Sequence, residues 1–304
     1  MSFPTSGGEG VGTAIGKFQL NIWSTFEIRD ELYDGSDRVG NRYNESLQLS
    51  QTFFDLQYTI DPEWAVGITL NYTDIFWRAP GLGPPGQGPR EREQGLGDTT
   101  LLFHWTAMDE PLDAEQAAMD ELPYAPDEWL RDPRIRLRAS FGSTLPTGDV
   151  KKLPENPNPL GTPVTALQLG IGTFNPMLAG QARMDWGGLA ASLDFVGVFP
   201  FYENRHDLQA GAYQKVAMTG EVVPAEDIRL ALAFEVEHRE RDEVDGEKIQ
   251  VGGGWRYLLH PQAVLSPWDD IHLFLGVTVP VHRDFDTEQV DYSERWELGV
   301  LFRF

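Results

Sequence analysis

Apolar and polar residues alternate along most of the chain, in about twelve segments with a period of two. The segment that ends the sequence shows the pattern most clearly. Its even-numbered positions from Trp296 to Phe304 are all apolar or aromatic, whereas Arg295, Glu297 and Arg303 lie between them. Successive side chains of a β-strand point to opposite faces of the sheet. This segment is therefore predicted to be a strand with one apolar face and one polar face.

The same rule predicts the other strands, and one of them departs from it. In residues 45–60, Leu47 and Leu49 fall out of phase with Phe54 and Leu56. A β-bulge, which adds one residue to a strand, is expected to restore the alternation there. The strands predicted before the closing one are residues 16–31, 45–60, 64–77, 95–107, 132–147, 173–186, 189–201, 208–222, 227–239, 247–259 and 268–283.

The connections between these strands alternate between short and long, with two exceptions. Every second connection is short in an outer-membrane barrel whose termini are both periplasmic. One exception, His260–Pro267, is of middling length. The other, residues 108–131, contains the stretch DAEQAAMDEL, whose helical propensity predicts a short periplasmic helix near residues 109–130. The short connections are Asp61–Glu63, Gly187–Gly188 and Val223–Glu226, and the long ones are residues 32–44, 78–94 and 148–172.

These features predict an all-β fold, a transmembrane antiparallel β-barrel of about twelve strands within a range of about ten to fourteen. Residues 1–304 would form a single domain, with residues 1–15 as a flexible N-terminal segment and residues 109–131 as the periplasmic insert. No run approaches the roughly 18 apolar residues that a membrane-spanning helix needs. The mean hydropathy of −0.35 fits alternating strands as well as it fits a soluble protein.

The two ends of the sequence bear on location. The start, MSFPTSGGEGVGTAIG, has neither the basic region nor the apolar core of a signal peptide. A location in the bacterial outer membrane therefore requires that a signal peptide has been removed, and a soluble all-β protein is the alternative. The terminal Phe304 resembles the last residue of outer-membrane barrels, where it is part of the signal read by the barrel assembly machinery. Phe304 is predicted to have that role.

Charged side chains in the middle of the strands are predicted to face the lumen. Facing Arg and Glu or Asp side chains would either fill a narrow barrel as ion pairs or line a polar conduit. The predicted lumen-lining residues are Arg29, Asp55, Arg136, Arg138, Arg183, Asp185, Lys215, Arg229, Glu235, Arg256, Arg295 and Glu297. Aromatic residues near strand ends are predicted to form girdles at the membrane interfaces. The predicted girdle residues are Trp64, Trp105, Trp186, Trp268 and Trp296.

The composition excludes several partners and sites. The formal net charge of −23 argues against a nucleic-acid partner, which would need a basic face. The chain has no cysteine, so it has neither disulfides nor thiolate metal sites. Acidic runs at residues 239–247 and 284–291 lack the ordered ligand spacing of a calcium loop. They are interpreted as solvated loops, and no metal or cofactor is predicted.

Nothing in the sequence indicates catalysis. Outer-membrane hydrolases with a serine nucleophile need a Ser and a His in hydrogen-bonding reach. None of the six histidines lies in a His-x-Ser-Asn arrangement, and no GxSxG motif occurs. His272 and His282 share a strand face but lie about 33 Å apart along it, too far to bind one metal ion. The prediction is that the protein is not an enzyme and has no catalytic residues.

Three short motifs carry a resemblance to a known family. Residues 95–101 read GLGDTTL, residues 145–149 read LPTGD, and residues 169–173 read LGIGT. Their order is similar to that in the outer-membrane proteins grouped as "MetA-pathway of phenol degradation" transporters. The resemblance extends from Gly95 to Phe201 and more loosely to the end of the chain. It implies an outer-membrane barrel associated with uptake of aromatic or other hydrophobic compounds.

The predicted function is an outer-membrane channel or transporter for a small, hydrophobic or aromatic solute. The alternative is a non-transporting barrel that anchors a periplasmic or surface partner. Predicted partners are outer-membrane lipid and lipopolysaccharide, the barrel assembly machinery and the small solute. Should the lumen be closed, a hydrophobic solute would need a lateral or extracellular pocket, for which Phe76, Trp77 and the Pro/Gly-rich residues 79–89 are candidates.

Overall fold

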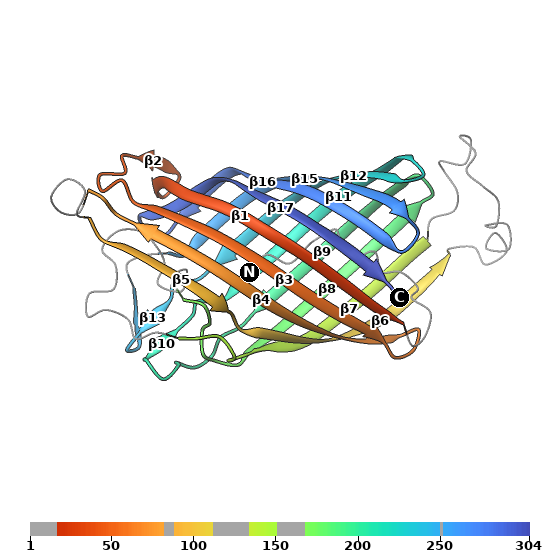
Figure 1. The fold of residues 1–304 in the computed structure, drawn as a ribbon, viewed down its shortest axis with the longest axis horizontal. Coiled ribbons are helices and arrows are strands. Elements are labelled where there is room, and N and C mark those ends of the chain that lie inside the picture. The colour runs from red at the N-terminus through yellow and green to blue at the C-terminus, as the bar shows by residue number, and fades with distance from the viewer. Residues whose placement is uncertain (1–16, 82–87, 112–133, 151–167, 250–251) are drawn as a thin grey trace.

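In a computed structural model of the 304-residue chain, one antiparallel sheet closes on itself (Figure 1). The structure describes residues 17–81, 88–111, 134–150, 168–249 and 252–304. The strands are β1 (Phe18–Asp34), β2 (Asp37–Val39), β3 (Ser46–Thr59), β4 (Trp64–Arg78), β5 (Arg90–Leu96), β6 (Thr99–Pro111), β7 (Arg134–Leu145), β8 (Asn175–Trp186), β9 (Leu189–Val198), β10 (Leu208–Gln209), β11 (Tyr213–Ala225), β12 (Ile228–Arg239), β13 (Glu243–Val244), β14 (Glu247–Lys248), β15 (Gly254–Trp268), β16 (Ile271–Phe285) and β17 (Gln289–Arg303).

Twelve of these strands make the barrel wall, in the order β1, β3, β4, β6, β7, β8, β9, β11, β12, β15, β16 and β17. β17 returns to pair with β1, with Arg303 opposite Gln19. At this seam Phe18 and Phe304 exchange two backbone hydrogen bonds of 2.8 and 3.0 Å. The predicted all-β fold, a closed antiparallel barrel of twelve strands, is confirmed.

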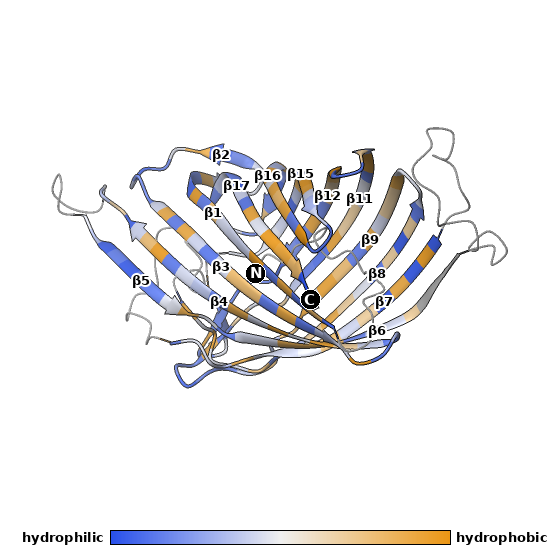
Figure 2. Cartoon of the chain, turned by 45° about the vertical axis from the view of Figure 1, so that its right-hand side comes forward, coloured by the Kyte–Doolittle hydropathy of each residue, from blue (hydrophilic) through white to orange (hydrophobic). Residues whose placement is uncertain are grey.

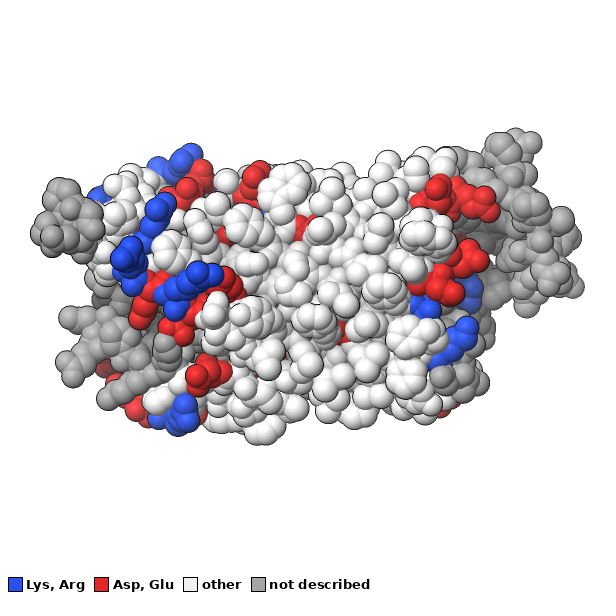
Figure 3. All heavy atoms as spheres, in the orientation of Figure 1, with Lys and Arg blue, Asp and Glu red and all other residues white. Residues whose placement is uncertain are grey.

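The alternating apolar and polar positions of the sequence form the outer and inner surfaces of the barrel. Figure 2 shows the strands striped with apolar and polar positions. Large apolar side chains point outward, such as Leu70 at 42% exposure and Leu298 at 61%. On the face shown in Figure 3, charged residues gather at the two ends and leave a middle band almost free of charge. A soluble protein rarely exposes so wide an apolar surface, so the outer wall is built to lie against lipid. Among the described residues, no helix is long and apolar enough to cross a membrane.

The two ends of the barrel differ. At one end, called here the turn end, β3–β4, β8–β9, β11–β12 and β15–β16 are joined by connections of two to four residues. The other end, the loop end, carries the longer connections β1–β3, β4–β6, β7–β8, β9–β11 and β12–β15, the short β16–β17 connection and the small sheet β10–β13–β14 (Figure 1). β6 and β7 are joined at the turn end through residues 112–133. The predicted flexible segment 1–15 lies outside the described residues. The predicted insert 109–131 does so from residue 112 on, and its first three residues belong to β6.

Two predictions about the strands are wrong. β3 pairs with both neighbours in one unbroken register, so no bulge lies near Leu47 and Leu49. Their side chains face the lumen, in the same phase of β3 as the buried Phe53. The lumen is apolar near Leu47 and Leu49, so apolar residues fit there. The stretch His260–Pro267 is not a connection but the second half of β15. Pro261 is exposed on the outer face, and the strand continues through it to Trp268.

Candidate functional site

The inner wall of the barrel has two sides of different character. On the first side, formed by β11, β12, β15, β16, β17 and β1, charged side chains are buried and matched. Asp291 is fully buried and accepts hydrogen bonds from Arg283 Nε at 2.7 Å and Arg256 Nε at 3.2 Å. Arg29 Nη2 lies 2.5 Å from Glu27 Oε1. This side is the ion-paired side.

Further ion pairs continue down the ion-paired side. Lys215 Nζ lies 3.7 Å from Glu235, which is 1% exposed, and His260 Nδ1 lies 3.4 Å from the same carboxylate. His260 Nε2 is 4.0 Å from Glu297. Arg295, 8% exposed, donates to the Thr278 hydroxyl at 3.3 Å. Long side chains of both signs therefore occupy this part of the lumen.

A separate cluster of ion pairs fills the lumen close to the turn end. Arg183, 8% exposed, donates to Glu221 at 2.5 Å through Nη1 and to Asp185 at 3.0 Å through Nε. Arg229 Nε approaches the same Glu221 at 3.7 Å. One buried carboxylate thus faces two guanidinium groups, and the Coulomb attraction offsets part of the cost of burying the charges.

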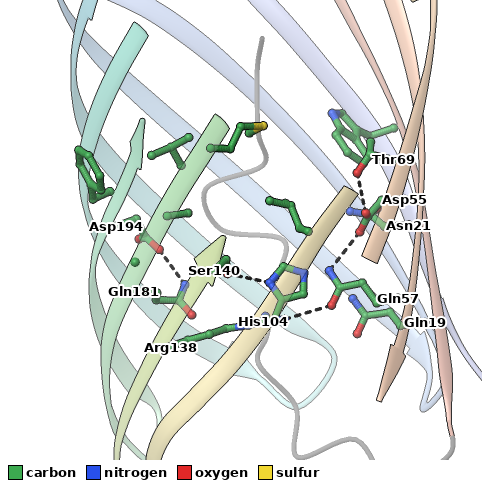
Figure 4. A pocket seen from close by; sticks show the side chains of 17 residues that line it. Gln19, Asn21, Asp55, Gln57, Thr69, His104, Arg138, Ser140, Gln181 and Asp194 are labelled. Carbon is green, nitrogen blue, oxygen red and sulfur yellow. Dashed lines mark hydrogen bonds between the residues drawn. The ribbon is translucent and has the colours of Figure 1, made fainter. Parts of the chain in front are cut away.

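The second side, formed by β3, β4, β6, β7, β8 and β9, holds a cavity of about 170 Å³ instead, which side chains of the adjoining β1 also line (Figure 4). A hydrogen-bond chain crosses its floor. Thr69 donates to Asp55 at 2.8 Å, Gln57 Nε2 donates to Asp55 at 3.1 Å, and Arg138 Nη2 donates to Gln57 Oε1 at 3.2 Å. The chain links β4, β3 and β7 across the lumen. On the opposite wall Gln181 donates to Asp194 at 2.7 Å.

Arg138 differs from Arg256 and Arg283, the two arginines that pair with Asp291. Its one side-chain hydrogen bond is to a neutral amide oxygen, and no carboxylate oxygen lies within 4 Å of it among the described residues. A guanidinium group has five N–H donors. Asn21 also lines the cavity, and its Oδ1 is buried without a partner in the described part of the chain. The cavity therefore offers unused hydrogen-bonding groups.

Apolar side chains line the part of the cavity nearer the loop end. Three strands, β1, β6 and β8, show the same order. Trp23 lies above Asn21 on β1, Leu102 above His104 on β6, and Met177 above Gln181 on β8, with "above" meaning closer to the loop end. The Trp23 ring stacks on Phe53 with a centroid distance of 4.7 Å. The cavity is apolar toward the loops and polar toward the turns.

A buried apolar cluster lies above the cavity, at the loop end of β3 and β4. It consists of Leu47, Ile75, Trp77 and Ala79, all at most 9% exposed. Trp77 Nε1 donates to Glu45 at 2.8 Å, which satisfies the indole inside the cluster. In the sequence, Trp77 is a candidate for a lateral or extracellular pocket. The phase of Leu47 in its strand is the sequence feature that indicates an apolar lumen at this point.

A histidine and a serine meet on the wall of the cavity. His104 Nδ1 and Ser140 Oγ lie 2.7 Å apart. Within the described residues, no carboxylate lies within hydrogen-bonding distance of His104. A serine nucleophile needs a base whose second nitrogen is oriented by a third group. The described residues also contain no cluster of His, Asp and Glu able to hold a metal ion.

The other residues singled out in the sequence lie as follows. Arg136 is 8% exposed on the inner face of β7. Trp64 and Trp105 stack at the turn end with centroids 6.3 Å apart, and both are about two-fifths exposed on the outer wall. Trp186 and Trp268 lie at the same end, whereas Trp296 lies midway along β17. Phe304 is 61% exposed, and its ring stacks on Phe18 at 6.2 Å.

Comparison with known proteins gives a likeness of fold. No family model matches the chain, and no curated protein matches it. Two barrels match with lower TM-scores. The β domain of the Bordetella autotransporter BrkA has a TM-score of 0.44, 10% identity and coverage of 96% of this chain and 100% of that one. The Ralstonia pickettii toluene transporter TbuX has a TM-score of 0.40, 10% identity and coverage of 96% and 90%. The COG4313 outer membrane channel from Pseudomonas putida F1 matches with a TM-score of 0.66 and 14% identity, over 98% of this chain and 99% of that one, so the chain has the fold of an outer-membrane barrel.

Proposed function

We propose that the protein is an outer-membrane channel for a small solute with an apolar ring and one polar end. The observation that carries the proposal is the cavity of about 170 Å³ inside the barrel. An engineered protein cavity of about 150 Å³ takes up benzene, so this space suits a single ring. The fold likeness to an outer membrane channel supports the same class of function.

The order of residues along the cavity supports an oriented solute. Its ring would lie against Trp23, Leu102 and Met177, toward the loop end. Its polar group would meet Arg138 and Asn21, toward the turn end. Long loops are extracellular in outer-membrane barrels. Whichever end of the solute entered first, it would rest with its polar group toward the periplasm.

The surrounding roles are part of the same proposal. The outer-wall Trp64 and Trp105 support a periplasmic-side girdle against lipid, and lipopolysaccharide would cover the opposite leaflet. The inward-pointing charged residues would line the lumen. Phe304 would serve as the signal for the barrel assembly machinery. Deleting Phe304 should then lower the amount of folded protein in the outer membrane, and normal assembly of the deletion variant would refute that role.

The ion-paired side favours a second candidate, a barrel that does not transport but anchors a partner. There the lumen is filled by matched charges. Single-channel recording in planar bilayers separates the two candidates. A channel should give a small but defined conductance in potassium chloride, and millimolar benzyl alcohol, a ring with one polar group, should block it. A barrel that inserts but stays silent would refute the channel.

A further inference from the structure

We propose that Asp98 is a positioning residue that holds a cap over the loop-end mouth of the lumen, and that release of this cap controls access to the cavity from outside. The cap comprises residues 146–150 and 168–174, which belong to the connection between β7 and β8. This inference rests on the proposed function, because a cap regulates access only if a solute enters.

Asp98 sits at the joint between β5 and β6 and is 5% exposed. One carboxylate oxygen accepts the backbone N–H of Gly148 at 2.9 Å, and the other accepts that of Ile171 at 2.7 Å. The two donors lie 50 and 73 residues further along the chain. Hydrogen bonds to a carboxylate are among the stronger kind, so one side chain fixes both arms of the cap.

The contact is so close that it requires glycine on the cap. A Cβ on Gly148 would lie 2.8 Å from the Gly170 Cα and 2.8 Å from the Gly97 carbonyl carbon. A Cβ on Gly170 would lie 2.5 Å from Asp98 Oδ1. The Thr147 hydroxyl adds a second link, because it accepts the Thr99 N–H at 2.8 Å. The three sequence motifs that resemble a known family therefore meet at one point.

The held segment reaches into the lumen. Leu169 packs against the buried cluster of Leu47, Ile75 and Trp77, whose side chains face inward from β3 and β4. A Cβ on Gly95 of β5 would lie 2.9 Å from Leu169 Cδ1. β5 pairs with β4 on one edge, and no described strand pairs with its other edge. The cap thus lies beside the unpaired edge of β5 and on the lumen side of β3 and β4.

A neighbouring loop supports the cap from its outer side. Asn204 Nδ2 donates to the Ile171 carbonyl at 2.7 Å, and Arg205 Nη2 donates to the Val150 carbonyl at 3.1 Å. These bonds go to neutral backbone acceptors, whereas Asp98 binds the cap directly to the barrel wall. Both Asp98 oxygens accept backbone N–H groups of the cap and the side chain is buried, so Asp98 is assigned the role of holding the cap.

The absence of cysteine from the chain allows a clean test. Ala179 lines the cavity, so Ala179→Cys places one thiol there. The purified, folded barrel in detergent is treated with a charged methanethiosulfonate reagent, and the labelling rate is followed by mass spectrometry. Asp98→Asn keeps the shape of the side chain but replaces one acceptor oxygen with an N–H donor. It should speed labelling about tenfold, equivalent to about 1.4 kcal/mol in the opening equilibrium.

The matched control is Asp149→Asn, which makes the same chemical change at an exposed carboxylate on the cap. Its labelling rate should equal that of Ala179→Cys alone. Equal rates for Asp98→Asn and Asp149→Asn would overturn the inference. Asp98→Asn could fail to fold, which would show as loss of the heat-dependent mobility shift on a gel. In that case the labelling rate of Leu169→Ser tests the inference instead. Leu169→Ser loosens the cap from the apolar cluster and should also speed labelling, and an unchanged rate would overturn the inference.

The labelling and conductance experiments distinguish failure of the cap from failure of the proposed channel. Labelling reports access to the cavity whether or not ions pass through the barrel. If every variant were silent in planar bilayers while Asp98→Asn still labelled faster, the proposed channel would fail and the cap would stand. If the parent conducted but Asp98→Asn changed neither labelling nor open probability, the cap would fail and the channel would stand.

Discussion

On the ion-paired side of the lumen, Asp291 accepts hydrogen bonds from two arginines and has no exposed surface. On the cavity side, Arg138 reaches across to a neutral glutamine and finds no carboxylate within 4 Å in the described residues. Both sides carry Arg and Asp on alternate positions of their strands. The difference teaches that charge on the inner face does not by itself decide between a filled and an open lumen. Matched long side chains fill the space, whereas Thr, Ser, Ala and Gln leave a cavity.

The strongest test removes a partner from the ion-paired side. Asp291→Ala should lower the free energy of unfolding by about 3–5 kcal/mol, because it leaves the Arg256 and Arg283 charges buried without their carboxylate. Urea-induced unfolding in lipid vesicles, followed by tryptophan fluorescence, measures the change. A loss below about 1 kcal/mol, the range of exposed pairs, would mean that this side is solvated rather than packed.

Removing a charged side chain on the cavity side should lower the free energy of unfolding much less. Arg138→Met removes one hydrogen bond to a neutral acceptor, so the expected loss is about 1 kcal/mol. Asp55 and Asp194 would then be the charges nearest the cavity, and the channel should become more selective for cations. Unfolding in urea and the reversal potential in a salt gradient measure the two effects. A stability loss as large as that of Asp291→Ala would break the comparison between the sides.

Filling the cavity should affect conduction and leave stability nearly unchanged. Ala179→Phe places a ring in a space that is about one ring wide, so conductance should fall by about an order of magnitude. The free energy of unfolding should change by less than about 1 kcal/mol, because the space is vacant of side chains. A wild-type conductance in Ala179→Phe would show that ions pass elsewhere, and the cavity would no longer be the candidate site.

The smallest effect is expected outside the lumen. Arg92 Nη2 lies 2.7 Å from Asp74 on the outer wall, and its side chain is 62% exposed. Arg92→Ala should change the free energy of unfolding by about 0–1 kcal/mol, and raised salt should shrink the difference. This variant sets the scale for Asp291→Ala, because both remove one member of an ion pair. A change above about 2 kcal/mol would contradict the assignment of this pair as solvent-screened.

Much of the barrel could be predicted from the sequence because alternation is a local signal. The closing strand, the buried position of Glu297 and the exposed position of Leu298 follow from counting in steps of two. The errors arose where the environment changes along one strand. Leu47 and Leu49 look out of phase only if the lumen is assumed to be polar along its whole length. The stretch His260–Pro267 looks like a connection, yet Pro261 lies opposite Leu232 within the ladder.

The candidate site and the cap could not be predicted in the same way. The cavity depends on side-chain lengths from six strands that meet across the barrel, and no local pattern records that sum. Asp98 holds Gly148 and Ile171, which are far away in the chain. The short motifs around these residues were visible, but only the fold shows that they touch.

The seam between β1 and β17 has a consequence for how the molecule forms. Within the described wall, β3–β4, β8–β9, β11–β12, β15–β16 and β16–β17 each join strands that follow one another closely in the chain, so they need only short loops to close. The contact between Phe18 and Phe304 instead joins opposite ends of the polypeptide. Such a long-range pairing carries a large loop entropy and slows folding. Ring closure is therefore expected to be the last and rate-limiting event of barrel folding.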